Sequence, residues 1–290
     1  MVRFKDSLLS GKFVYTAEVY LPHGCDIKAF KRNLRKLKGI VDAVNLTDNQ
    51  RALLRLSPLA GAVIALKIGI DPILHVSCRD RNRLAIQADL LGAWSMGVQT
   101  VLLITGDHPF SGEKYKDAKP VFDLDSVNLI LLCKKLNEGI DFEGYKLKGK
   151  TDFFIGAAVN PFSTPLEPEL IKFEKKIKAG AQFFQTQIVF DTEKFKEFMK
   201  YVKKFNTKII AGIAILTSYR FAEFMKNRLP GVYIPDEVIK RLKSAKDVQE
   251  EGFKISLEIA KEIKNLCDGF YIVTMGKERL IPDFVSELKS

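Results

Sequence analysis

KIIAGIAIL, at residues 208–216, and TVLLIT, at residues 100–105, are short stretches composed almost entirely of apolar residues. A strand that is buried on both faces has this composition, and such strands belong to parallel sheets covered by helices. The two stretches therefore predict an α/β protein built around a parallel sheet.

Eight runs rich in β-branched and aromatic residues recur along the chain, and segments with helical periodicity separate them. The predicted strands are residues 13–21, 43–47, 73–78, 100–105, 153–159, 183–190, 208–216 and 270–275. Asp26, Ser57-Pro58 and Asp80 stand where helices are expected to begin. Eight β-to-α repeats favour a closed (βα)8 TIM barrel. An open doubly wound sheet is the weaker alternative, because no GxGxxG follows the first strand and no GxxxxGK[ST] occurs.

Two segments are longer than this repeat requires. Residues 107–124 are expected to form a polar loop after the fourth strand, and residues 230–268 are expected to hold two helices before the eighth strand. A chain of 290 residues, 47% of them hydrophobic, can bury one large core. We therefore expect residues 1–290 to form a single barrel domain.

The chain shows no sign of a membrane span, a secretory signal or a metal site. No apolar run of about 18 residues occurs, and the first residues, MVRFKDSLLSGKF, contain no apolar signal core. The four cysteines form no CxxC pair, and the three histidines show neither HxxxH nor HExxH spacing. The sequence thus predicts a cytoplasmic protein without bound metal.

The net charge of +11 raises the question of a nucleic-acid partner. The lysines of residues 31–38, 174–178 and 193–204 alternate with apolar residues at helical spacing, and the last two segments also contain glutamates. This pattern is typical of the solvated face of amphipathic helices. We therefore expect no nucleic-acid partner.

In a barrel of this kind the active site lies at the C-terminal ends of the strands. The polar residues at the predicted strand ends are Glu18, His23, Thr47, Asp48, Asn49, His75, Ser77, Cys78, Thr105, Gly106, Asp107, His108, Asn160, Gln185, Gln187 and Thr274. This set includes all three histidines of the chain. The candidate site therefore lies on this face.

Four of these residues suggest chemistry. Burial of Glu18 among apolar neighbours would raise its pKa towards the range of a general acid, although a structural salt bridge is the alternative. Asp107 follows Gly106 and could accept two hydrogen bonds from an aminopyrimidine ring, or could cap a turn or helix. His75 could bind a ligand or be a core histidine. The Gln187 amide could contact a heterocycle or a barrel neighbour.

Seven motifs, taken in order, resemble those of the methylenetetrahydrofolate reductase family over about residues 10–285. They are TAEVYLP (16–22), VNLTDN (44–49), ILHVSCRDRN (73–82), LLITGDHP (102–109), GAAVNP (156–161), KKIKAGAQFFQTQIVFD (175–191) and AGIAILTSYRF (211–221). Each motif alone is weak. Their order and their fall on successive predicted strands make the combination specific.

The resemblance implies an oxidoreductase that reduces 5,10-methylenetetrahydrofolate to 5-methyltetrahydrofolate through a bound flavin. Glu18 matches the family's general acid, which protonates N5 of the folate, and Asp107 and Gln187 match residues that bind the folate. The positions that match the flavin site are Thr47, His75, Thr105, Gly106, Asp107, Ala157, Glu169 and Lys176. Lys176 could neutralise a flavin phosphate.

The chain departs from the family pattern in three places. Thr105 stands where many members carry an arginine, Val159 replaces a tyrosine, and the loop of residues 160–167 is shorter. These departures leave open whether the flavin is FAD or FMN. FAD is the expected cofactor from the resemblance, with FMN as the alternative. The electron donor is expected to be NADH or NADPH, bound over the flavin at the folate site, or else reduced ferredoxin or a partner subunit.

Three other functions stay open. The chain could be a flavin-free reductase, another flavin-dependent barrel oxidoreductase, or an electron-relay subunit of a larger redox complex. The combination of Glu18, Asp107 and Gln187 favours folate chemistry. No heptad pattern specifies a partner helix, so the sequence does not determine the oligomeric state. It also does not identify the exact folate or modified pterin carrier.

Overall fold

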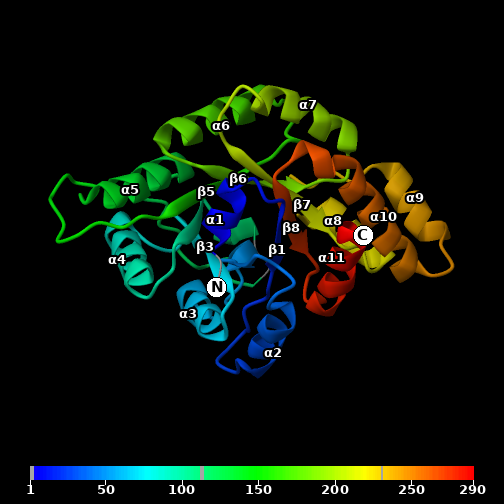
Figure 1. Ribbon diagram of the computed structural model, residues 1–290, viewed down its shortest axis with the longest axis horizontal. Helices are drawn as coiled ribbons and strands as arrows, with labels where there is room; N and C mark the ends of the chain where they lie inside the picture. Colours follow the sequence, from blue (N-terminus) through cyan, green and yellow to red (C-terminus); the bar gives the residue numbers. More distant parts are fainter. Residues whose placement is uncertain (1–2, 112–113, 230) are drawn as a thin grey trace.

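A closed ring of parallel strands is the central feature of the computed structural model, which describes residues 3–111, 114–229 and 231–290. Each strand pairs with the next one along the chain, and β8 closes the ring by pairing with β1 (Figure 1). The strands are β1 (Val14–Glu18), β2 (Ala43–Leu46), β3 (Asp71–Ser77), β4 (Thr100–Ile104), β5 (Phe154–Val159), β6 (Phe183–Ile188), β7 (Lys208–Ala214) and β8 (Gly269–Val273). This topology confirms the predicted (βα)8 barrel.

Helices surround the barrel, apart from α1 (Phe4–Leu9), which lies in the middle of the ring in Figure 1. They are α1 (Phe4–Leu9), α2 (Lys28–Leu37), α3 (Pro58–Ile68), α4 (Arg83–Ser95), α5 (Ser126–Glu138), α6 (Glu167–Ala179), α7 (Thr192–Val202), α8 (Tyr219–Arg228), α9 (Asp236–Ser244), α10 (Val248–Ile263) and α11 (Ile281–Lys289). The two helices expected within residues 230–268 are α9 and α10. In the predicted loop 107–124, Pro109–Ser111 forms a short 3-10 helix, and residues 112 and 113 lie outside the described residues.

Helices follow all three of the expected start signals. Helix α3 begins at Pro58, and Asp26 accepts a hydrogen bond from the Lys28 backbone N–H (2.9 Å) at the start of α2. Helix α4 begins at Arg83, three residues after Asp80. Its cap is Asn82, whose side chain accepts from the Ala85 N–H (3.0 Å), while the Asp80 carboxylate pairs with Arg79.

Several predicted strands extend beyond the observed ones at their C-terminal ends. Strands β1, β6 and β7 end at Glu18, Ile188 and Ala214, two or three residues earlier than expected. The apolar residues that follow, such as Val19 and Ile215, are fully buried. Apolar character reports burial, and burial continues where the chain leaves the ring and passes under the helices.

The N-terminal half of the barrel interior is filled with apolar side chains. Phe4 of α1 packs against Phe154 and Phe183, with ring centroids 6.2 and 5.4 Å away. Asp71, at the start of β3, accepts hydrogen bonds from the Phe4 N–H and the Arg3 guanidinium, both at 2.8 Å. Helix α1 therefore closes this end of the barrel and lies in the middle of the ring in Figure 1.

The C-terminal half of the interior is polar. Thr16, Glu18, Asn45, His75 and Gln185 project from β1, β2, β3 and β6 and are each 5% exposed or less. Side chains of a barrel interior stack in layers contributed by different strands. The polar layers lie above the apolar ones, and they place the candidate site at the C-terminal mouth.

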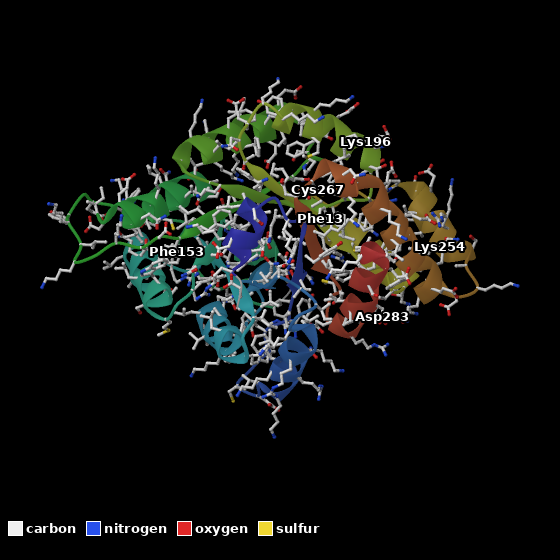
Figure 2. The ribbon with its side chains drawn as sticks, viewed as in Figure 1. Phe13, Phe153, Lys196, Lys254, Cys267 and Asp283 are labelled. Carbon is white, nitrogen blue, oxygen red and sulfur yellow. The ribbon has the colours of Figure 1, made fainter. Side chains whose placement is uncertain are left out.

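The outer helix faces carry the positive charge, as the lysine spacing predicted. Figure 2 shows lysine side chains on the outer surface, among them Lys196 of α7 and Lys254 of α10. Lys196 pairs with Glu193 and Glu262 at 2.6 Å each. Across the described ranges, no helix combines the length and apolar character that crossing a bilayer requires.

Replacing Phe4 with alanine should destabilise the fold by about 3–5 kcal/mol, because it leaves a cavity among the apolar side chains, including Phe154 and Phe183, that fill the N-terminal half of the barrel. Urea denaturation would measure the loss of unfolding free energy. The control is Leu9→Ala on the same helix, since Leu9 is 54% exposed and its truncation should cost about 0.5 kcal/mol or less. A Phe4→Ala protein as stable as this control would show that α1 does not stabilise the barrel.

Candidate active site

Two adjoining cavities open among the C-terminal ends of the strands. The larger has a volume of about 380 Å³ and the smaller about 140 Å³. Gln50, Asp107, Gln187 and Tyr271 line both of them, and Glu18 lines the smaller one. The carboxyl groups of Glu18 and Asp107 and the Gln187 amide therefore face one connected space.

The structure brings together nearly all residues that the sequence placed in the site. Those lining one or both cavities are Glu18, Thr47, His75, Thr105, Gly106, Asp107, Glu169, Lys176 and Gln187. Ala157 is the exception, because its side chain is fully buried in the core between the barrel and the helices. Side chains alternate along a strand, so its neighbour Ala158 lines the larger cavity instead.

Glu18 is 2% exposed, and its Oε2 accepts a hydrogen bond from the Tyr271 hydroxyl. Its other oxygen, Oε1, has no hydrogen-bond partner among the described residues. Burial raises the pKa of Glu18 to about 7, and the negative charge of Glu278 adds to this, while the Tyr271 hydrogen bond and the nearby Gln50 side chain act in the opposite direction. A hydroxyl rather than a cation faces this carboxyl group, which favours the proton-donor interpretation over a structural salt bridge.

Asp107 follows β4 in a turn that depends on Gly106. Gly106 has a φ of +90°, and a Cβ atom there would lie 3.0 Å from the Ser77 Cβ and 3.3 Å from the Arg79 Cβ. The Asp107 carboxylate accepts a hydrogen bond from the Arg51 backbone N–H at 3.3 Å. Asp107 does not cap α5, whose cap is Asp125, and it lines both cavities.

A buried guanidinium joins the loops that carry these groups. Arg79 is 1% exposed and donates to the backbone oxygens of Asp48 (3.5 Å), Asn49 (3.1 Å) and Asp107 (3.3 Å). Its charge is balanced by Asp80, at 2.7 Å. Arg79 thereby connects the loop after β2 to the loop after β4.

The loop after β2 is strained where it meets the cavities. Asn49, Arg51 and Ala52 have φ values of 44°, 58° and 52°, in the left-handed region that non-glycine residues seldom adopt. Such strain persists only where surrounding contacts enforce it, and it concentrates at functional sites. Here it brings Gln50 to Glu18 and the Arg51 N–H to Asp107.

The far wall of the larger cavity carries a buried cation, Lys176, and a buried hydroxyl, that of Ser126. Lys176 of α6 is 5% exposed, and its ammonium group donates to the Ala158 carbonyl at 2.5 Å. Burial lowers the pKa of Lys176 to about 8, while the nearby Glu169 carboxylate acts in the opposite direction, so the amine is mostly protonated at pH 7. The Ser126 hydroxyl at the start of α5 is buried without a partner among the described residues. Lys172 also lines this wall.

The histidines do not converge on a metal. His75 lies inside the barrel, His108 stacks on Phe122 with ring centroids 5.9 Å apart, and the exposed His23 lies 3.5 Å from the Tyr115 hydroxyl. No group of potential metal ligands occurs in the part of the chain that the structure describes.

Sequence reasoning missed four residues of the site: Arg79, Gln50, Tyr271 and Ser126. Arg79 had a signal, because it lies in the polar run CRDRN directly after an apolar strand. Tyr271 carries the only polar side-chain group in the strand GFYIV, although nothing in the sequence connects it to Glu18. Gln50 and Ser126 had no signal that separates them from ordinary loop and helix-start residues.

The fold and the site together define a (βα)8 barrel with polar cavities at its C-terminal mouth and a buried carboxyl group of raised pKa in their wall. The chain belongs to the methylenetetrahydrofolate reductase family, whose sequence profile matches residues 3–289.

Named relatives agree with this assignment. "Methylenetetrahydrofolate reductase 2" of Schizosaccharomyces pombe is 27% identical over 237 residues, which are 73% of this chain and 35% of that protein. "Probable methylenetetrahydrofolate reductase (NADPH)" of Caenorhabditis elegans is 25% identical over 232 residues, 76% of this chain and 32% of that protein. The matches thus cover about a third of the length of these relatives.

A solved structure shares the whole fold. It is described as "Uncharacterized protein from Clostridium thermocellum binds two copies of 5-methyl-5,6,7,8-tetrahydrofolic acid". The two chains superpose with a TM-score of 0.71 over 98% of each, at 17% sequence identity. At this identity the likeness shows a common fold.

The raised pKa of Glu18 predicts a pH dependence of stability that Glu18→Gln removes. A carboxyl whose pKa rises from 4.5 to about 7 on folding contributes stability below pH 4.5 and loses it as the pH rises through 7. Between pH 4.5 and pH 8, wild type should therefore lose up to about 3 kcal/mol relative to Glu18→Gln. Urea denaturation across this range measures the difference. The exposed-site control Glu237→Gln should follow wild type, and a Glu18→Gln curve parallel to wild type would contradict the raised pKa.

Proposed function

We propose that this chain reduces 5,10-methylenetetrahydrofolate to 5-methyltetrahydrofolate, with a bound flavin as hydride carrier. The observation that carries the proposal is the convergence of Glu18, Asp107 and Gln187 on one cavity, with the pKa of Glu18 raised to about 7. Family membership supports it, as does the folate that the Clostridium thermocellum protein of the same fold is described as binding.

The residues around the larger cavity suit a flavin nucleotide. The protonated Lys176 and the unpartnered Ser126 hydroxyl at a helix N-terminus can both bind a phosphate. Gly106 allows the backbone to approach a flat ring closely. No guanidinium stands at Thr105, but Arg79, which follows the neighbouring strand β3, places one beside the same turn. Once bound, the flavin would supply the hydride.

We favour FAD over FMN because a third cavity adjoins the flavin wall. It has a volume of about 480 Å³ and shares Thr105 and Gly106 with the cavity of about 380 Å³ that Lys176 lines. His108 and Phe122, which stack on each other, lie in its wall. This space could take the adenylate half of FAD, which FMN lacks.

The protein's own groups have distinct roles in the proposed reaction. Glu18, protonated below about pH 7, donates its proton to N5 of the folate so that the five-membered ring can open. The Asp107 carboxylate can accept two hydrogen bonds from the aminopyrimidine edge of the pterin, and the Gln187 amide can bind the same ring. Tyr271 holds the Glu18 carboxyl group at the cavity wall.

The electron donor is proposed to be NADH or NADPH, in keeping with the name of the Caenorhabditis elegans relative. It would bind over the flavin in the space that later takes the folate, so that the two substrates alternate. Reduced ferredoxin or a partner subunit is the alternative donor. Flavin bleaching on anaerobic addition of each candidate separates these cases.

Glu18→Gln tests the acid. The variant should bind flavin with an unchanged absorption spectrum but lose about 10²- to 10⁴-fold in turnover of methylenetetrahydrofolate, the usual contribution of a general acid. Anaerobic stopped-flow assays with both substrates measure this. Glu237→Gln, on the surface, is the control. Turnover within tenfold of wild type would exclude Glu18 as the proton donor, and a colourless wild-type protein that reduces folate would exclude the flavin.

Tyr271→Phe tests how the acid is tuned. The hydroxyl hydrogen bond lowers the pKa of Glu18, so its removal should raise that pKa further. The alkaline limb of the folate-reduction pH profile should therefore move to higher pH, with Tyr145→Phe on the exposed surface as the control. A limb that stays in place would show that Tyr271 does not act on Glu18.

A further inference from the structure

A chain of buried hydrogen bonds lies inside the barrel beneath the candidate site. The Thr16 hydroxyl lies 3.3 Å from the Phe270 carbonyl oxygen, and the Asn45 amide nitrogen lies 3.0 Å from the Thr16 Oγ1. Asn45 Oδ1 lies 3.1 Å from His75 Nε2 and 2.7 Å from Gln185 Nε2. Thr16, Asn45, His75 and Gln185 are each 5% exposed or less.

The Phe270 carbonyl at one end of this series of hydrogen bonds determines the direction of every hydrogen bond in the series. A carbonyl oxygen can only accept, so Thr16 donates its single proton to Phe270 and must accept from the Asn45 amide group. The Asn45 oxygen then faces the other way, towards His75 and Gln185. Because this oxygen also only accepts, both of those side chains donate to it.

Two acceptors remain at the end of the hydrogen-bond series that faces the larger cavity. Burial lowers the pKa of His75 to about 3, so the ring is neutral and carries one N–H, which Asn45 uses at Nε2. His75 Nδ1 is therefore an acceptor. Gln185 Oε1 is buried and has no hydrogen-bond partner among the described residues. Both side chains line the larger cavity, whereas Thr16 and Asn45 lie beneath it.

We propose that Gln185 and His75 form an acceptor floor that binds an N–H group of the ring held in the larger cavity. A buried acceptor without a partner is costly, and a ligand donor would remove that cost. This floor rests on the proposed function, and it would also orient the cofactor. The oxidised flavin ring has a single N–H, at N3 between its two carbonyl groups, so the floor would take the N3 edge of the flavin.

The tautomer of His75 tests the direction of the hydrogen bonds without any ligand. The chain has three histidines, so ¹⁵N-labelled histidine gives few NMR signals, and a His75→Gln protein assigns the relevant one. We expect neutral His75 with its proton on Nε2 and a bare Nδ1 between pH 5 and pH 8. A proton on Nδ1 would mean that the network runs the opposite way and that the floor donates, which would overturn the proposal.

Flavin methylated at N3 tests whether the floor accepts a hydrogen bond from the N3–H of the flavin. The protein of residues 1–290, freed of flavin, would be titrated with FMN and with 3-methyl-FMN, and the ratio of the two dissociation constants would be compared among variants. Wild type should bind FMN at least about fivefold more tightly. Gln185→Leu, of similar size, should reduce this ratio because no Oε1 is left to accept. Gln87→Leu is the matched control, since Gln87 is buried in α4 away from the cavities and should leave the ratio unchanged.

The outcomes separate this inference from the proposed function. Equal binding of the two flavins to wild type, or a ratio that Gln185→Leu leaves unaltered, would overturn the acceptor floor while a flavin enzyme remained. Failure of wild type to bind FAD as well as FMN and 3-methyl-FMN would overturn both. Thermal unfolding of each variant confirms that the compared proteins are folded.

Discussion

Burial of polar groups inside a closed parallel barrel is the constraint on which the rest of this structure depends. The apolar cluster around Phe4 fills the N-terminal half of the interior, so the polar side chains gather in the C-terminal half. There they must bond to one another or to a ligand, because an unpaired polar group in a dry interior is costly. The same burial raises the pKa of Glu18 and keeps His75 neutral.

The loops above the barrel hold their shape through one buried cation. Arg79 bonds to backbone oxygens on two loops, and the loop after β2 keeps three non-glycine residues in left-handed conformations. Each such residue costs about 1 kcal/mol or more. Hydrogen bonds from a buried charged group offset part of that cost. The strain is tied to the site because it aims Gln50 and the Arg51 N–H at the two carboxyl groups.

Thr105 and Arg79 both contact the segments around the turn that carries Asp107. Arg79 follows β3, and its guanidinium donates to the Asp107 carbonyl. The Thr105 hydroxyl meanwhile accepts from the Ser126 N–H, at 3.2 Å, and thereby anchors the start of α5. A cation from the loop after β3 therefore lies beside the Gly106-Asp107 turn.

The sequence by itself determined the barrel, because continuous apolar runs record burial on both faces, and its motifs located Glu18, Asp107, Gln187 and Lys176. It misjudged strand ends, since burial continues past the last paired residue. It also did not reveal that the Ala157 side chain points into the core, since one position along a strand reverses the side chain. Only the tertiary structure decided the contacts of Tyr271 with Glu18 and of Gln185 with Asn45, which join residues 253 and 140 positions apart. No local pattern encodes such pairs, because closing the ring, rather than any segment within it, brings them together.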